Sequence, residues 1–246
     1  MKKSRLIFAA LLAACVVGLY GLRAQDEEQR NETKFTFGRV YFDYPTWRRW
    51  GPVGAGNGPP WSHDTPRSEN HMMKIMAEVS KLDPNPDPHV FSFQTDDCFK
   101  YPIAYFCEVG WLNFSEDEAH RMAEYLLRGG FLIVDDFRGE REFENFKRNL
   151  RMAFPDRSLE EVPRTDPIWN CFYDISKLFP EPPYSQWLVP QYLGLRDDKG
   201  RLMMIVDYNT DISEYWEWSD DPFAPIEQTN EAYKYGVNYI MYAMTH

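Results

Sequence analysis

The sequence predicts an α/β fold with a parallel sheet, helices on both faces and an antiparallel hairpin at one edge. The strongest indication is a strand–helix–strand unit, with strands at 102–107 and 131–136 and a helix at 116–128. The second of these strands is apolar on both faces, which is typical of the centre of a parallel sheet. Strand and helix patterns alternate along the rest of the chain, which favours a flavodoxin-like arrangement.

The helix at 116–128 has clear signals at both ends. Ser115 and Glu118 have capping-box spacing, in which each side chain satisfies a backbone donor of the first helical turn. Gly129 stands where a left-handed residue commonly ends a helix. These signals fix the boundaries of the helix between the two strands.

Three elements are predicted before this unit. Residues 35–42 and 90–94 have strand patterns, and a helix capped by Ser68 runs to about residue 82. Residues 43–67 form a long loop rich in glycine and proline, and loops of this length are usually functional lids or disordered.

The second half of the chain continues the pattern. Helices are predicted at 142–154 and 230–244, and a short strand at 158–162. Strands at 192–196 and 201–207 flank a four-residue loop, which predicts the antiparallel hairpin. The aromatic and acidic residues that follow the hairpin are interpreted as a polar link.

The N-terminus has the pattern of an export signal. Residues 1–24 combine a basic start, an apolar run and a small residue, Ala24, at the cleavage point. Residues 25–34 are predicted to be a flexible leader, and 35–246 a single α/β domain. The mature protein would be periplasmic or extracellular, without a membrane span. Two alternatives stay open: a lipoprotein with a lipidated Cys15, and an uncleaved membrane anchor.

Charge and cysteine content narrow the function classes. Removing the basic N-terminal segment lowers the formal charge from −11 to about −15, which disfavours nucleic acid as a partner. Cys98, Cys107 and Cys171 contain no Cys-x-x-Cys pair, so a zinc ribbon is not supported. A disulfide between Cys98 and Cys107 is an open alternative outside the cytosol.

Carboxylates follow the predicted strands, and the carboxyl ends of parallel strands meet at one edge of a sheet. We expect Asp97, Asp135 and Asp136 to anchor a polar ligand or a divalent cation such as Mg²⁺ or Ca²⁺. Glu108 and Asp135 are the candidates for catalytic acid or base. The alternative is that these acids only cap turns.

A second candidate surface is aromatic. The loop after the first strand contributes large rings that could stack on a ligand beside the crevice. The predicted ligand-binding residues are Asp43, Tyr44, Trp47, Trp50, Trp61, Asp97 and Asp136. The alternative is that the rings pack onto the domain.

Nucleophilic catalysis by Cys107 is not favoured. The flanking residues lack the glycines of a nucleophile elbow, and residues 121–245 contain no histidine to act as its base. The five histidines lack metal-ligand spacing and are interpreted as solvated.

Five stretches of the sequence form a recognisable set of motifs: Tyr101-Pro102-Ile103-Ala104-Tyr105, Ser115-x-x-Glu118, the run 125–136 ending in Asp135-Asp136, the opening 35–44, and Tyr235-Gly236-Val237-Asn238-Tyr239. Through these motifs the sequence resembles the bacterial domain-of-unknown-function 4159 family over residues 35–245. The resemblance implies an exported or envelope-associated protein with a fold similar to class I glutamine amidotransferases. It implies no activity, and the Gly-x-Cys-x-Gly and His-x-Glu motifs of the amidotransferases are absent.

Two function hypotheses follow. The first is a non-catalytic module of the cell envelope that binds a small polar ligand or another envelope protein. The second is an enzyme that uses carboxylates, with or without a divalent cation, on a glycan or another small polar substrate. A metal in the crevice, or carboxylates with strongly raised pKa values there, would favour the enzyme.

Overall fold

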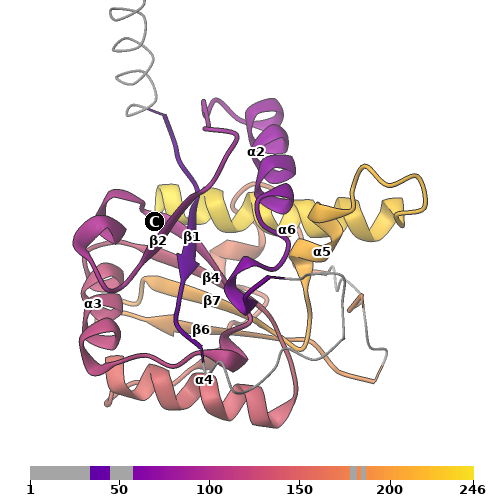
Figure 1. Cartoon of the computed structure of the whole chain (residues 1–246). Helices are drawn as coiled ribbons and strands as arrows, with labels where there is room; N and C mark the ends of the chain where they lie inside the picture. Colours follow the sequence, from indigo (N-terminus) through magenta and orange to yellow (C-terminus); the bar gives the residue numbers. More distant parts are fainter. Residues whose placement is uncertain (1–33, 45–57, 178–181, 184–186) are drawn as a thin grey trace, which may run out of the picture. The chain divides into compact units, whose positions relative to one another are not determined.

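A mixed sheet lies at the centre of the computed structural model, which describes residues 34–44, 58–177, 182–183 and 187–246 (Figure 1). Within these residues the sheet has seven strands in the order β2-β1-β3-β4-β7-β6-β5. The strands are β1 (Gly38–Tyr41), β2 (His89–Ser92), β3 (Ile103–Cys107), β4 (Phe131–Phe137), β5 (Glu160–Glu161), β6 (Gln191–Arg196) and β7 (Leu202–Tyr208). The first five strands in that order run parallel, and β6 and β5 add antiparallel pairing at one edge. The α/β class with a mostly parallel sheet and an antiparallel edge is confirmed.

The predicted hairpin is present as β6 and β7, but its second strand has another place in the sheet than expected. β7 pairs in parallel with β4, so only β6 and β5 are antiparallel additions. All residues of β7 are buried, because its apolar run is covered on both faces like that of β4. The carboxyl end of β7 therefore lies at the same edge of the sheet as those of β3 and β4.

Helices cover both faces of the sheet (Figure 1). On one face α3 (Glu116–Leu127) and α4 (Gly139–Ala153) pack onto the core that contains Phe106 and Leu132. On the other face lie α2 (Arg67–Val79), α5 (Ile212–Glu217) and α6 (Ile226–Thr245). There the ring of Trp216 contacts that of Tyr105, with 5.6 Å between centroids.

The helix boundaries follow local chemistry. In α3 the Ser115 hydroxyl accepts from the Glu118 amide at 3.3 Å, and the Glu118 carboxylate accepts from the Ser115 amide at 2.8 Å, so the capping box is confirmed. Gly129 is left-handed, with φ of 111°. The expected cap of α2, Ser68, is instead buried inside the helix, because Pro66 occupies the position before its first turn.

The helix α5 was not predicted, since residues 207–218 were interpreted as a polar link. The side chain of Asp211 caps it by accepting from the Glu214 amide at 3.0 Å. Burial of Tyr215 and Trp216 between α5 and the sheet explains why this aromatic stretch is helical.

Cys98, Cys107 and Cys171 are free thiols, which corrects the alternative of a Cys98–Cys107 disulfide. Cys98 precedes β3 and Cys107 ends it, so a strand of about 16 Å separates them. None of the helices in the described ranges is long and apolar enough to cross a membrane. The predicted export segment, and the leader up to residue 33, lie outside those ranges.

Candidate metal centre

Four side chains meet at the carboxyl ends of β4 and β7, and we call them the acidic centre. They are His63, Asp64, Asp136 and Asp211. One ligand atom of each lies within 4.8 Å of those of the other three. Ligands on one metal ion at about 2.1 Å lie up to about 4.2 Å apart, so a small contraction would bring all four onto a single ion.

The elements that build the acidic centre lie far apart in the chain. Asp136 belongs to β4, and Asp211 follows β7 as the cap of α5. His63 and Asp64 come from the loop between β1 and α2, directly after the short 3-10 turn Pro60–Ser62. The Nδ1 atom of His63 lies 2.7 Å from Oδ2 of Asp136 and 3.4 Å from Oδ1 of Asp64.

Sequence reasoning found only Asp136 of these four residues. His63 was interpreted as solvated, but 82% of its side chain is buried and it is bonded to Asp136. Asp211 was missed because β7 was expected at an antiparallel edge. Its spacing to Glu214 matches a helix cap and was the available signal. Nothing in the pattern around Asp64 indicated that its loop returns to the sheet edge.

Backbone strain concentrates at this edge of the sheet. Among the described residues, the non-glycine residues with positive φ are Asp64 (63°), Glu108 (52°), Asp136 (53°) and Asn209 (64°). Three of them end β3, β4 or β7, and the fourth belongs to the acidic centre. The pairing of β4 with β7 also shifts register between Val134 and Phe137. Bulges and left-handed non-glycine residues persist mainly where function requires a particular side-chain direction.

The acidic centre places three carboxyl groups around one histidine. Burial raises the pKa of Asp64 well above its ordinary value, and the charge of Asp136 raises it further, although His63 opposes this. Burial likewise raises the pKa of Asp211, with contributions from Asp136 and Asp64. Burial and the neighbouring carboxylates therefore favour the protonated forms of Asp64 and Asp211 in the metal-free protein.

Asp136 is the carboxylate that stays ionised. Burial would raise its pKa, but the hydrogen bond from His63 and the charges of His63 and Arg138 lower it below its ordinary value. The pKa of His63 is raised by the same interaction. Burial lowers this pKa, but the hydrogen bond to Asp136 and the charge of Asp64 outweigh burial and raise it to about 9. The pair is an imidazolium–carboxylate ion pair at neutral pH.

Two carboxylate oxygens of the centre lack hydrogen bonds within the described residues. They are Oδ1 of Asp64 and Oδ2 of Asp211, and both are buried. Their partner oxygens are satisfied, since the Ser213 hydroxyl donates to Asp64 Oδ2 at 2.5 Å and the Glu214 amide donates to Asp211 Oδ1. A buried carboxylate oxygen without a hydrogen bond is costly, although Oδ1 of Asp64 does lie 3.4 Å from the His63 ring nitrogen, and a cation would satisfy both oxygens. One imidazole nitrogen with three carboxylate oxygens suits Mn²⁺, Fe²⁺ or Zn²⁺.

Glu108 lies at the end of β3, as predicted, and is 7% exposed. Burial, the charge of Asp136 and the charge of Glu142 raise its pKa to about 11, although Arg138 opposes this. The group is protonated at neutral pH and can act as a proton donor.

Asp135 lies near the carboxyl end of β4, as predicted, and its contacts are with Tyr105 and the start of α5. Its Oδ2 atom accepts from the Tyr105 hydroxyl, from the Ile212 amide at 2.8 Å and from the Ser213 amide at 3.2 Å. Burial raises its pKa to about 7, although the Tyr105 bond opposes this. The residue fixes the first turn of α5 and so positions Asp211.

Asp97 does not join the acidic centre, which corrects the prediction of a shared sheet edge. Its Oδ2 atom lies 2.8 Å from Nε2 of His89, the first residue of β2, and its Oδ1 atom lies 2.9 Å from the Lys100 ammonium. The 3-10 segment Asp96–Lys100 returns the chain to the start of β3, so Asp97 lies beside the amino end of β2.

The remaining predicted ligand residues lie near the end of β1. Asp43 is exposed and accepts from the Tyr41 hydroxyl at 2.7 Å and from Gln94 at 3.0 Å. Tyr44 and Trp61 are partly buried and pack against the core. The ring of Trp61 meets that of Tyr41 edge-on, 5.3 Å between centroids, so it packs onto the domain. Trp47 and Trp50 lie outside the described residues.

Cys107 is fully buried at the end of β3. Burial raises the pKa of its thiol well above the ordinary value, although the Arg39 guanidinium, 2.9 Å away, opposes this. Its sulfur also contacts the carbonyl oxygens of Pro60 and Trp61. The thiol supports the loop that carries His63 and Asp64.

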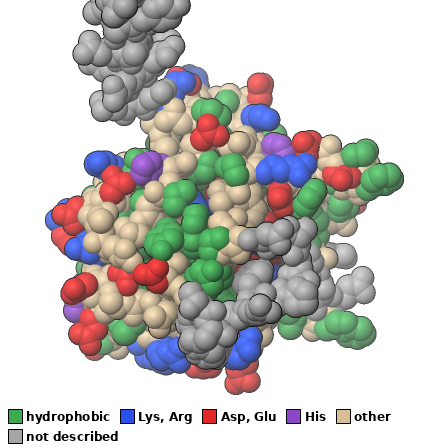
Figure 2. Space-filling view, in the orientation of Figure 1, with side chains coloured by type: hydrophobic (Ala, Val, Ile, Leu, Met, Phe, Trp, Pro, Cys, Tyr) green, Lys and Arg blue, Asp and Glu red, His purple; other side chains and the backbone are tan. Residues whose placement is uncertain are grey.

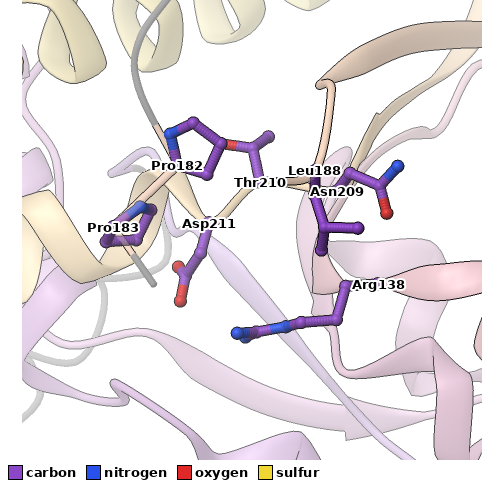
Figure 3. Close-up of a pocket in the computed structure, with 7 residues that line it drawn as sticks. All are labelled: Arg138, Pro182, Pro183, Leu188, Asn209, Thr210 and Asp211. Atoms are coloured by element: carbon purple, nitrogen blue, oxygen red, sulfur yellow. The ribbon is translucent and has the colours of Figure 1, made fainter. Parts of the chain in front are cut away.

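A pocket opens beside the acidic centre (Figure 3). Its lining residues are Arg138, Pro182, Pro183, Leu188, Asn209, Thr210 and Asp211. The Asp211 carboxylate and the Arg138 guanidinium extend into the same space (Figure 3). Arg138 also donates to Asp136 Oδ1 at 2.6 Å. The space, of about 10 Å³, holds one water-sized group, such as a single oxygen of a substrate, next to one cationic side chain and the carboxylates.

The fold and the site define an α/β domain with a buried acidic centre at the carboxyl edge of its sheet. The profile of the family described as Domain of unknown function (DUF4159) matches residues 52–244, so the chain belongs to that family. No curated protein matches the sequence.

Proposed function

We propose that this domain is a divalent-cation-dependent enzyme that hydrolyses a small polar substrate at the acidic centre. The observation that carries the proposal is the convergence of His63, Asp64, Asp136 and Asp211 within 4.8 Å, with two buried carboxylate oxygens lacking hydrogen bonds. The raised pKa values of Asp64 and Asp211 support it, because perturbed carboxylates concentrate at catalytic sites.

The roles follow from the geometry. A cation held by the four side chains would supply Lewis-acid chemistry and an activated water. Glu108, protonated at neutral pH, would donate its proton to the leaving group. Arg138 would orient an oxygen of the substrate in the pocket beside Asp211.

We further propose that the fold is flavodoxin-like and similar to the class I glutamine amidotransferases. The parallel order β2-β1-β3-β4-β7 supports this, since it matches the flavodoxin-like order when β7 takes the fifth position. Ligands of such sheets bind at the carboxyl edge, where the acidic centre lies. The buried thiol of Cys107 argues against amidotransferase chemistry.

The second candidate is a non-catalytic binding or interaction module of the cell envelope. The export-signal pattern of residues 1–24 favours an exported, periplasmic or extracellular location for either candidate. The module is favoured by one further observation, an aromatic groove outside the acidic centre.

The test measures thermal unfolding in EDTA and then with excess Mg²⁺, Ca²⁺, Mn²⁺ or Zn²⁺. At a hundredfold excess over Kd a cation stabilises the folded state by about 2.7 kcal/mol, which raises Tm by roughly 5–11 °C for a chain of this size. We expect this rise with Mn²⁺ or Zn²⁺ in the parent protein and in Asp97→Asn, and its loss in Asp64→Asn.

The activity arm uses p-nitrophenyl glycosides, esters and phosphates, and amino-acid p-nitroanilides including that of arginine, with the cation that stabilises the protein best. Turnover that is lost in Asp64→Asn and in Glu108→Gln, but kept in Asp97→Asn, supports the enzyme. Stabilisation without turnover of any substrate class would favour the binding module. No rise in Tm with any cation would refute both the metal centre and the enzyme built on it.

A further inference from the structure

A groove of about 410 Å³ runs along α5 and the start of α6, next to the acidic centre. We call it the α5–α6 groove, and the residues used below are Glu214, Tyr215, Trp218, Asp221, Phe223 and Thr229. Glu214 also belongs to a second acidic group, in which its carboxylate, that of Glu217 and that of Asp64 approach within 4.8 Å. The groove and the acidic centre are therefore adjoining parts of one surface.

The groove presents aromatic rings to solvent. Phe223 is 92% exposed and Trp218 is 37% exposed. Hydrophobic side chains stand beside acidic ones at the right-hand tip of the molecule, where the α5–α6 connection lies (Figure 2). Exposed rings of this size are a common feature of binding surfaces.

The chain already holds one of its own guanidinium groups at the rim of the groove. The Arg67 guanidinium lies 4.6 Å from the ring centroid of Trp218 and donates to Asp220 at 2.5 Å. This is a cation–π contact combined with an ion pair. The same combination of ring and carboxylate is available inside the groove.

The local charge favours a positively charged ligand. Residues 202–233 contain eight acidic residues and no lysine or arginine. Two of these acids, Glu214 and Asp221, line the groove itself. Such a run raises the local concentration of cations near the groove.

One buried polar group in the groove also lacks a partner. The hydroxyl of Thr229 has no hydrogen bond among the described residues, and the residue is 7% exposed. Since Thr229 lines the groove, a ligand N–H can donate to its hydroxyl oxygen. This observation is independent of the charges and the rings.

We propose that the α5–α6 groove binds a basic side chain of a peptide, with arginine preferred over lysine. The guanidinium would stack on the ring of Phe223 while its N–H groups meet Glu214, Asp221 and the Thr229 hydroxyl. The alkyl part would lie against Tyr215 and Trp218. Arginine is preferred because its planar group stacks on rings and carries five donors. This inference rests on the proposed function, because it treats the adjoining acidic centre as the site of the reaction. The substrate class would then be a basic peptide.

The test is calorimetric titration in EDTA with Nα-acetyl-arginine amide, Nα-acetyl-lysine amide, Nα-acetyl-glutamate amide and cellobiose. We expect binding of the arginine probe, weaker binding of the lysine probe, and none of the acidic or sugar probe. Affinity should fall by about 2- to 30-fold in Phe223→Ala, the range of an aromatic cation contact, and it should fall in Asp221→Asn and Thr229→Val.

The matched controls are Trp187→Ala, an exposed ring that does not line the groove, and Asp198→Asn, an exposed acid on the β6–β7 turn. Both should bind as the parent does. Phe223 is almost fully exposed, so its removal does not disturb folding. Binding of cellobiose in place of the arginine probe, equal loss in the control variants, or no binding of any probe would overturn the proposal.

Failure of the proposed function gives a different result. If the acidic centre holds no cation, adding metal changes the Tm of Asp64→Asn and of the parent protein by the same amount, while arginine binding in EDTA is unaffected. If the groove proposal fails, metal stabilisation persists and the arginine probe does not bind.

Discussion

Replacing Glu108 with glutamine removes one buried ionisable group from the carboxyl edge of the sheet while keeping its shape. The pKa of Glu108 rises from an ordinary 4.5 to about 11, because the group is buried and faces the charges of Asp136 and Glu142. Between pH 6 and pH 9 the folded protein therefore holds a proton on Glu108 that the unfolded chain has lost.

The sign and size of the effect follow from this difference of one proton. A carboxyl group whose folded pKa is raised costs stability as pH rises from its unfolded pKa towards its folded pKa. The cost is at most about 1.4 kcal/mol per pH unit, or about 4 kcal/mol from pH 6 to pH 9. The glutamine stays neutral, so from pH 6 to pH 9 the Glu108→Gln protein should lose about 4 kcal/mol less stability than the parent protein. His63, with a pKa raised to about 9, contributes the same loss to both proteins between pH 6.5 and pH 9.

The assay is urea unfolding followed by tryptophan fluorescence at pH 6, 7, 8 and 9 in EDTA. Glu78→Gln, an exposed glutamate on α2, is the matched control and should have the pH slope of the parent. The reasoning is refuted when Glu108→Gln and the parent lose stability with the same slope.

Three further predictions concern the scaffold. Arg39→Met should cost about 3–5 kcal/mol of folding stability, since it leaves the buried Glu69 carboxylate without its ion-pair partner. The double variant Arg39→Met/Glu69→Leu should recover stability in urea unfolding. A double variant as unstable as Arg39→Met would contradict the ion-pair explanation. Ser115→Ala should cost about 1 kcal/mol of folding stability through loss of the α3 capping box. The shift in the urea midpoint measures this loss, and an unchanged midpoint would contradict the prediction. Gly236→Ala should cost about 1–3 kcal/mol, because a Cβ atom would lie 2.5 Å from the Trp216 ring; an unchanged Tm would show that α5 and α6 can separate freely.

Periodicity and caps predicted most of the fold, because each element carries its own local signal. The β3–α3–β4 unit is the clearest case: its strands are buried apolar runs, and Ser115, Glu118 and Gly129 mark the helix ends. The position of β7 in the sheet could not be predicted from its own residues. A hairpin strand with a long apolar run pairs equally well at the edge or in the centre of a sheet. Its neighbours are decided by packing across the whole sheet.

The candidate site was only partly predictable for the same reason. Strand ends pointed to Glu108, Asp135 and Asp136, but separating a ligand from an anchor required the contacts of Asp135 with Tyr105 and the α5 amides. Asp97 follows a strand in sequence and still returns to the opposite edge through a 3-10 turn. His63 and Asp64 follow the short 3-10 turn Pro60–Ser62, and no periodic pattern predicts that this turn lies at the sheet edge.

The most direct test of the acidic centre is the number of protons released when Mn²⁺ or Zn²⁺ binds, measured by calorimetry at pH 7 in buffers of different ionisation enthalpy. His63, with a pKa raised to about 9, is an imidazolium at pH 7, and burial raises the pKa values of Asp64 and Asp211. A cation that binds all four side chains must therefore displace at least the His63 proton. We predict that one cation binds per chain and that at least one proton is released. Cation binding and proton release should both be lost in Asp64→Asn and kept in Asp97→Asn. Binding without proton release, or binding that Asp64→Asn leaves unchanged, would contradict the assignment of the metal centre.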